Sequence, residues 1–331
     1  GVRLDRRSIE TILIDFDGTP LARRAYDMVL PEPAEALAMV AGDVQALLER
    51  LDPQARERFA GIGLALPYKL GAWLRRLDLP VEIFQRWDDF DFAAQLEEAT
   101  GLPVFSENDG NAAAIAELFY GLGRRVDDFL YLFIGPAIGG GIVVKGDCLR
   151  GSTGNAGDVA VIAVAPSRLG SSPKSEDGRE LLITRASLNA LGRHLQARGV
   201  PVNSPADMQA AFAAGHPAVL EWIEDAVEAL APAIWSAIAL LDVPLIVVDA
   251  DIDGGLVDAL IARLAVALDQ HAPEARRPPR ILHGTLGRDA GAIGAATLPM
   301  FFNFSPRASI LTRDDDDSEF ETGPMRLAGL T

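Results

Sequence analysis

Residues 105–117 place three polar side chains between an apolar run and an alanine-rich stretch. The polar triplet is Glu107, Asn108 and Asp109, and residues of high helix propensity follow it. This order predicts a strand, a polar turn and a helix. In an open α/β sheet, ligands bind at the carboxyl ends of strands, where such turns lie. Asn108 and Asp109 are therefore candidates to point into a cleft, with the alternative that one of them only caps the helix.

The rest of the chain alternates between segments typical of strands and segments typical of helices. Apolar or alternating runs predict extended segments at 11–15, 21–28, 59–67, 129–134, 142–144, 159–164, 245–249 and 281–286. Helical spacing of apolar residues, and prolines in first turns, predict helices at 31–51, 92–100, 180–196, 205–214, 217–241, 256–270 and 287–304. An Asp-Gly pair within residues 15–20 predicts a hairpin. The alternation indicates an α/β protein made of two α/β halves.

Residues 135–141 read Gly-Pro-Ala-Ile-Gly-Gly-Gly and separate two predicted strands. No helix is predicted directly after these glycines, which distinguishes the segment from a dinucleotide-binding fingerprint. Two interpretations stay open. In one, the backbone N–H groups of a hairpin loop face a phosphate. In the other, the glycines only permit positive φ in a tight turn.

Composition narrows the classes of function. The 331 residues are enough for two domains, and the net charge of −17 argues against nucleic-acid binding by this surface. The single cysteine, Cys148, excludes an intramolecular disulfide and a Cys-based zinc motif. No apolar run is long enough to span a bilayer and no signal peptide opens the chain, so a cytoplasmic location is expected.

The two ends of the sequence carry expectations of their own. The chain opens on Gly1 rather than Met, so this residue is either a remnant of expression cloning or an internal residue of a longer protein. Four consecutive aspartates stand at 314–317, and almost nothing after them could form a core. Residues 312–331 are therefore expected to form an acidic disordered tail.

Several landmarks follow one another in a fixed order. They are the Asp-Gly hairpin, Glu-Asn-Asp-x-Asn-Ala-Ala-Ala-x-x-Glu from Glu107, three glycines from Gly139, Gly-Asn-Ala-Gly from Gly154, and Asp-Ala-Gly-x-x-Gly-Ala-Ala from Asp289. Together they resemble the ROK family of repressors and sugar kinases, up to about residue 304. The resemblance implies a two-lobed actin-like ATPase (ribonuclease H-like) fold of the sugar-kinase type. It implies an N-terminal lobe at 1–115, completed by a helix at 288–304, and a C-terminal lobe at 116–287.

The resemblance also implies a ligand site in the cleft. It places a sugar there and, in the kinases of the family, ATP and Mg²⁺ beside it. The kinase aspartate that falls at Asp109 is the general base, which accepts a proton from the sugar hydroxyl that attacks the γ-phosphoryl group. Asn108 would hydrogen-bond sugar hydroxyls. Asp158 and Glu180 stand where the family has two sugar-binding glutamates.

The first strand departs from the family pattern. Asp-x-Gly-Gly-Thr normally lets the backbone approach the ATP phosphates, whereas residues 3–7 are Arg-Leu-Asp-Arg-Arg here. Arg3 replaces the aspartate that helps to hold magnesium, and Asp5 and Arg6 replace two glycines. Ordinary kinase geometry is therefore not expected, although two arginines could still attract phosphate.

Two further departures concern the glycine loop and zinc. Gly-Pro-Ala at 135–137 replaces Gly-Thr-Gly, so the nucleotide loop represented by Gly135, Gly139 and Gly140 is expected to be vestigial. Val-Ala-Val at 159–161 replaces Ile-Gly-His, and the Cys-rich motif that normally follows is absent. No zinc and no other bound metal is expected.

Two functions from different classes follow. The leading hypothesis is the effector-binding portion of a ROK-type transcriptional regulator, without kinase activity and without a cofactor. Its partners would be a sugar-like ligand, further copies in a homodimer or higher homo-oligomer, and DNA only through a winged helix-turn-helix module upstream. The alternative is a divergent sugar kinase that uses ATP and Mg²⁺, with Asp109 as the general base. A third possibility is a pseudokinase scaffold with no small ligand.

Overall fold

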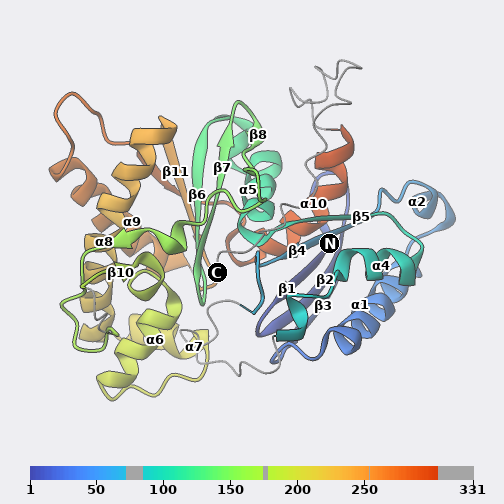
Figure 1. The fold of residues 1–331 in the computed structure, drawn as a ribbon, viewed down its shortest axis with the longest axis horizontal. Helices are drawn as coiled ribbons and strands as arrows, with labels where there is room; N and C mark the ends of the chain where they lie inside the picture. The colour runs from blue at the N-terminus through green and yellow to red at the C-terminus, as the bar shows by residue number, and fades with distance from the viewer. Residues whose placement is uncertain (72–84, 174–177, 253, 305–331) are drawn as a thin grey trace, which may run out of the picture.

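The computed structural model describes residues 1–71, 85–173, 178–252 and 254–304. The described chain forms two five-stranded mixed sheets, each with helices packed against it (Figure 1). The tail expected at 312–331 lies outside the described residues. None of the helices in the described part combines the length and the apolarity needed to cross a membrane.

The N-terminal sheet has the strand order β3-β2-β1-β4-β5. The pairs β3–β2 and β2–β1 are antiparallel, and β1–β4 and β4–β5 are parallel. Its strands are β1 (Val2–Asp5), β2 (Ser8–Ile14), β3 (Pro20–Asp27), β4 (Ile62–Leu66) and β5 (Val104–Asn108). The helices of this half are α1 (Pro33–Leu48), α2 (Pro53–Glu57), η1 (Gln85–Trp87) and α4 (Phe92–Thr100).

The second sheet has the order β12-β11-β6-β7-β8, with β12, β11 and β6 parallel and β6, β7 and β8 antiparallel. Its strands are β6 (Phe129–Ile134), β7 (Ile138–Val144), β8 (Asp147–Cys148), β11 (Leu245–Ala250) and β12 (Arg280–His283). The helices around it are η2 (Leu122–Arg124), α6 (Leu188–Ala197), α7 (Pro205–Ala213), α8 (Pro217–Leu241) and α9 (Gly254–Gln270). Each sheet joins an antiparallel meander to two parallel strands, so the two halves share one topology.

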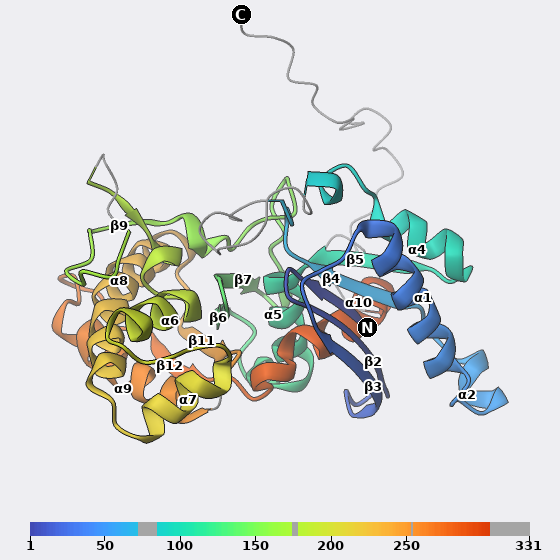
Figure 2. The ribbon, with the colours of Figure 1, turned by 90° about the horizontal axis from the view of Figure 1, so that it is seen from below.

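Two helices lie between the sheets, α5 (Asp109–Tyr120) and α10 (Ala290–Phe304), the latter preceded by η5 (Gly287–Asp289). Figures 1 and 2 show them side by side in the middle of the molecule. α10 packs against β4 and α5, whereas α5 also packs against β7. The C-terminal helix therefore returns to the N-terminal sheet. The predicted lobe limits at 115 and 287 stay a prediction.

The side-chain alternation of β1 decides which residues face these central helices. Val2 and Leu4 are fully buried in the hydrophobic cluster that also contains Val40 of α1. Because successive side chains of a strand point to opposite faces, Arg3 points to the other face, toward α10. There it lies next to Gly291, where a Cβ atom would be 2.8 Å from its Nε.

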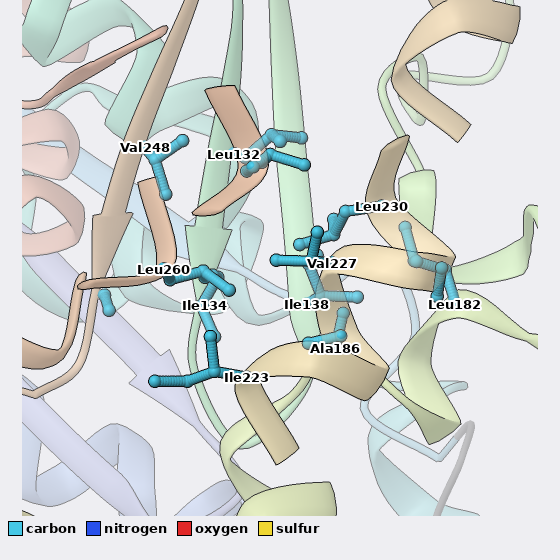
Figure 3. Packing of buried hydrophobic residues seen from close by; sticks show 14 of the residues in the cluster. Leu132, Ile134, Ile138, Leu182, Ala186, Ile223, Val227, Leu230, Val248 and Leu260 are labelled. Atoms are coloured by element: carbon cyan, nitrogen blue, oxygen red, sulfur yellow. The ribbon is translucent and has the colours of Figure 1, made fainter. Parts of the chain in front are cut away.

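The largest hydrophobic cluster belongs to the second half (Figure 3). Ile223, Val227 and Leu230 recur at helical spacing on α8, and their side chains belong to the same buried cluster as Ile134 and Ile138. Full burial of one such side chain contributes roughly 1.5–3 kcal/mol. This packing fixes the strands whose ends carry the site.

Two predicted elements were wrong. The strand expected at 159–164 is a 3₁₀ turn, η3 (Val159–Val161), followed by the short β9 (Ala163–Val164). The helix expected from residue 180 is β10 (Glu180–Leu181), η4 (Leu182–Thr184) and then α6. The backbone at residue 180 pairs with Val164 instead. Ser187 caps α6 by accepting a hydrogen bond from the Ala190 amide at 3.2 Å, so this helix begins late.

Candidate functional site

A cavity of about 190 Å³ lies between the two sheets. It is bounded by the β1–β2 turn, the N-terminus of α5, the β6–β7 turn and the loop before η3. Its main polar lining residues are Arg3, Asp5, Arg6, Arg7, Lys69, Asn108, Asp109, Asn155, Asp158 and Asn189. A ligand here would contact elements of both halves.

Asn108 and Asp109 stand at the junction of β5 and α5, as the sequence predicted. Asn108 caps the helix, because its Oδ1 accepts hydrogen bonds from the Gly110 amide at 2.9 Å and the Asn111 amide at 3.4 Å. It also lines the cavity, so the two interpretations of this residue are compatible. Asp109, the first residue of α5, is half-buried and lines the cavity beside it.

The surroundings of Asp109 raise the pKa of its carboxyl group, mainly through burial. Burial raises the pKa of Asp109, and the nearby carboxylate of Asp5 raises it further. Arg3 and Arg6, together with the Gly110 amide, offset part of this rise. Such a carboxyl group can accept a hydrogen bond from a hydroxyl group when it is ionised and can donate one when it is protonated.

Asp158 is tied to Asn108 through a residue that the sequence analysis did not single out. Asn155 donates a hydrogen bond from Nδ2 to Oδ2 of Asp158 at 3.0 Å, and its Oδ1 accepts one from Asn108 Nδ2 at 3.4 Å. The loop thus presents Asp158 and Asn155 to the same cavity as Asn108. The only sequence signal for Asn155 was its place in the Gly-Asn-Ala-Gly landmark.

The buried Glu107 anchors the same loop from the other side. Arg150 donates a hydrogen bond from Nε to Oε2 of Glu107, and its guanidinium lies 5.1 Å from the ring centroid of Phe302 on α10. Oε1 of Glu107 accepts hydrogen bonds from the Asn108 amide at 2.9 Å and from Asn111 Nδ2 at 3.2 Å. The loop, α5 and α10 are therefore linked through one carboxylate.

Glu180 is placed elsewhere. This side chain is buried on β10, where Oε2 accepts a hydrogen bond from Ser172 Oγ at 3.0 Å. It is not among the described residues that line the cavity. Of the four predicted ligand-binding residues, the structure brings together Asn108, Asp109 and Asp158.

The predicted glycine loop is mostly a strand. Gly135 lies in the β6–β7 turn, but Gly139 and Gly140 belong to β7, and none of the three has positive φ. All three line the cavity. A Cβ atom at Gly110 would collide with the carbonyl oxygen of Gly140, so small residues are needed where α5 crosses β7. Close backbone approach explains Gly140, because a Cβ atom there would lie 2.8 Å from the carbonyl oxygen of Tyr131 and 2.9 Å from that of Gly157, but it does not explain Gly139, where a Cβ atom would have nothing within 4 Å.

The resemblance assigns phosphate and magnesium contacts to residues 3–7, which form the end of β1 and the β1–β2 turn and line the cavity with four of their side chains. Arg6 is 6% exposed and donates hydrogen bonds to the carbonyl oxygens of Lys69 at 2.9 Å and Leu70 at 3.0 Å. Arg3 is 8% exposed, and its guanidinium stands where a metal-holding carboxylate would be expected. A guanidinium cannot ligate a cation, so these residues do not fit magnesium-bound phosphate. Within the described ranges, no three His, Cys, Asp or Glu side chains are grouped to hold a metal ion.

Known proteins resemble this chain over most of its length. A sequence model of the ROK family matches residues 1–300. A glucokinase from Halalkalibacterium halodurans is 32% identical over 239 residues, covering 64% of this chain and 68% of the glucokinase. A xylose repressor from Caldicellulosiruptor bescii is 27% identical over 159 residues, which is 48% of this chain and 39% of the repressor.

Solved structures show the same architecture. The crystal structure of a ROK hexokinase from Thermus thermophilus superimposes with a TM-score of 0.65 and 27% identity, covering 89% of this chain and 95% of the hexokinase. The predicted two-lobed actin-like ATPase fold of the sugar-kinase type is confirmed. The relatives include both kinases and repressors, so similarity alone does not separate the two roles.

Proposed function

This chain belongs to the ROK family, and from that premise we propose that it is the effector-binding portion of a ROK-type transcriptional regulator. It binds a sugar-like ligand in the cavity between the two sheets and does not transfer phosphate. Asn108, Asp109 and Asp158 hydrogen-bond the ligand's hydroxyl groups. DNA binding belongs to a helix-turn-helix module upstream of this chain.

The observation that carries the proposal is the contrast between two groups of residues that line the cavity. In one group, the hydrogen-bonded chain Asn108–Asn155–Asp158 offers amide and carboxylate groups of the kind that bind hydroxyls. In the other group, Arg3 and Arg6 replace the metal-holding carboxylate and one of the small residues that the resemblance associates with a nucleotide phosphate. Part of the set for binding a sugar is kept, whereas the residues expected to hold phosphate and magnesium are replaced.

The mechanism of regulation is a population shift. The cavity is lined by residues of both halves, so a bound ligand favours the lobe angle in which both sets of contacts form. Glu107 and Arg150 link the ligand loop to α10. A change of lobe angle would alter the geometry of a homodimer and the spacing of its DNA-binding modules.

A divergent sugar kinase is the second candidate, and Asp109 is the residue that favours it. This carboxyl group stands at the N-terminus of α5 in the cavity, and burial raises its pKa. A general base with a pKa nearer neutrality accepts a hydroxyl proton more effectively at physiological pH. The glucokinase among the relatives also agrees with this alternative.

Two measurements on the same protein separate the candidates. Thermal denaturation with a panel of neutral sugars, and separately with ATP and Mg²⁺, should show stabilisation by at least one sugar and none by ATP. A coupled assay of ADP release over the same panel should show no turnover. Asp17→Asn, which changes an exposed aspartate of the β2–β3 hairpin, is the control for Asp109→Asn. If the protein releases ADP, and Asp109→Asn abolishes this turnover while Asp17→Asn leaves it intact, the protein is a kinase. That result would exclude a regulator that has no kinase activity.

A further inference from the structure

Arg3 is a buried cation whose guanidinium makes no hydrogen bond to the described residues. It is 8% exposed, and its ion pair is a long one, from Nη1 to Glu10 Oε2 at 4.0 Å. Glu10 has a closer partner, Arg23, at 2.5 Å from Oε1. Arg6, the neighbouring buried arginine, instead has two backbone carbonyls as acceptors. Burial of a guanidinium without an acceptor is unfavourable, because its lost hydration is not replaced.

The surroundings of Arg3 hold its guanidinium at the cavity wall. Its Cζ lies 5.8 Å from the ring centroid of Phe133, at the end of β6. On the other side, Gly291 leaves room for the Arg3 side chain, because any Cβ there would be 2.8 Å from Nε. Both residues line the cavity together with Arg3. The donors of the guanidinium are therefore available to a ligand in the cavity.

Nearby carboxylates among the described residues favour the charged form of Arg3 but accept no hydrogen bond from its guanidinium. Burial opposes the charged form, but Asp5, Asp251, Asp109 and Glu10 together raise the pKa of Arg3. The three aspartates accept hydrogen bonds from other groups: Asp5 from the Arg6 amide at 2.6 Å, Asp109 from the Gly110 amide at 2.9 Å, and Asp251 from Arg288 Nε at 3.4 Å. None of these three aspartates forms an ion pair of 4.0 Å or less with Arg3, whose only such pair within the described part of the chain is the 4.0 Å contact with Glu10. An acceptor supplied by a ligand would complete the site.

We propose that the ligand is an anionic sugar, one that carries a carboxylate or a phosphate group, and that Arg3 binds this group. The inference rests on the proposed function, since it assumes that the cavity binds a sugar-like molecule. The flat guanidinium suits either group, because it offers parallel N–H donors to two oxygens of one anion. Arg7 and Lys69, which are exposed and line the same cavity, add positive charge at its rim. The hydroxyl groups of the ligand then lie toward Asn108 and Asp158.

Matched ligands test this assignment. Isothermal titration would compare four neutral sugars, each with its available uronate and 6-phosphate: glucose, galactose, mannose and N-acetylglucosamine. Inorganic phosphate and metal-free ATP are the anionic controls. At least one acidic sugar should bind tenfold or more tightly than its neutral parent. Comparison of the uronates with the 6-phosphates shows whether the site prefers a carboxylate or a phosphate group. Inorganic phosphate and ATP should bind more weakly than the acidic sugar, because neither presents the hydroxyl groups of the matching sugar to Asn108 and Asp158.

Variants of Arg3 complete the test. Arg3→Gln should reduce the preference for the acidic sugar at least tenfold, with the neutral parent bound within about twofold of wild type. Arg3→Lys should retain part of the preference. Arg86→Gln, which removes an exposed arginine from η1, is the charge-matched control and should behave as wild type. Equal thermal midpoints for Arg3→Lys and wild type would show that the site remains folded.

The outcomes separate this inference from the function on which it rests. If no sugar binds, neutral or acidic, the proposed function is wrong. If neutral sugars bind as tightly as acidic ones, sugar binding stands and the anionic ligand is excluded. A preference that survives Arg3→Gln would overturn the role given to Arg3. If inorganic phosphate or ATP binds as tightly as the acidic sugar, the assignment of an anionic sugar as the ligand is wrong.

Discussion

The side-chain amide of Asn155 donates a hydrogen bond to Oδ2 of Asp158 at 3.0 Å, within the loop that closes one side of the cavity. The other end of the Asn155 amide accepts a hydrogen bond from Asn108, which is also the cap of α5. One residue thus orients two candidate ligand contacts that come from different parts of the chain. Asp158 needs such an orienting group because an aspartate side chain at a cavity wall can otherwise adopt several rotamers.

Removal of the Asn155 amide should weaken ligand binding without unfolding the protein. A hydrogen bond to a charged group such as the Asp158 carboxylate contributes about 1.5–3 kcal/mol, so we expect Asn155→Ala to lower the affinity for the best-binding sugar by about tenfold or more. Isothermal titration measures the change. Asn203→Ala, at an exposed position before α7, is the control and should bind as wild type. Affinity unchanged in Asn155→Ala would mean that Asp158 does not contact the ligand.

Two helical glycines should respond oppositely to the same substitution. A Cβ atom at Gly110 would collide with the carbonyl oxygen of Gly140, so Gly110→Ala should cost about 1–3 kcal/mol of unfolding free energy and displace α5 from β7. Gly42 lies on the exposed face of α1 with nothing within 4 Å of its Cβ position, so Gly42→Ala should stabilise by roughly 0.5–1 kcal/mol. Urea denaturation of the two variants measures both effects. Stabilisation by Gly110→Ala would show that α5 does not need this close approach.

Local signals predicted much of the fold. The Asp-Gly hairpin is present, with Asp15 Oδ1 accepting from the Thr19 amide at 2.8 Å and Gly18 at φ 81°. The helix predicted at 92–100 matches α4 and ends at Gly101 in the left-handed conformation. These elements depend on residues within a few positions of each other, so their sequence is sufficient to specify them.

The wrong predictions concern segments that depend on distant partners. Glu180 begins a helix-like pattern, but its backbone pairs with Val164 of β9, a contact that no local pattern encodes. Likewise, the three glycines from Gly139 look like a turn, whereas they belong to β7, where Gly141 lies against Gly110 and Ala114 of α5. The cavity residues Asn108 and Asp109 were predictable because a strand end followed by a helix start is a local feature. The contacts that Asn155 makes with Asn108 and Arg150 makes with Glu107 were not predictable, because in each pair the two residues lie more than forty positions apart.

The buried ion pair between Arg185 and Asp225 should be a major determinant of stability in the second half. Arg185 is 1% exposed and donates to both carboxylate oxygens of Asp225, from Nε at 3.0 Å and from Nη2 at 2.8 Å. Asp225→Ala leaves the buried guanidinium of Arg185 with backbone carbonyls and the more distant Glu228, at 3.5 Å from Nη2, and should cost about 3 kcal/mol of unfolding free energy. Glu224→Ala, one residue away on α8, breaks the exposed pair with Arg263 and should change little. Urea denaturation of both variants is the measurement, and equal losses would contradict the special status of the buried pair.

Asp249 should make the stability of the protein depend on pH. It is 0% exposed and accepts hydrogen bonds from Tyr131 Oη at 3.0 Å and from the Gly287 amide at 3.1 Å. Burial raises the pKa of Asp249 from 3.8 to about 6, and the charge of Glu117 adds to the rise, while the Tyr131 hydroxyl offsets part of it. A pKa raised in the folded state means that the protonated carboxyl group favours folding. This contribution is complete below pH 3.8 and is lost as the pH rises through about 6.

Asp249→Asn should remove that dependence, because an amide does not ionise in this range. The unfolding free energy of the wild type should therefore fall by roughly 2.5 kcal/mol relative to Asp249→Asn between pH 4 and pH 8. Urea denaturation of both proteins at intervals of half a pH unit gives the two profiles. Asp242→Asn, whose side chain is 85% exposed at the end of α8, is the control and should run parallel to the wild type. If the profile of Asp249→Asn is also parallel to that of the wild type, then Asp249 is ionised in the folded protein throughout this range and its partners compensate fully for its burial.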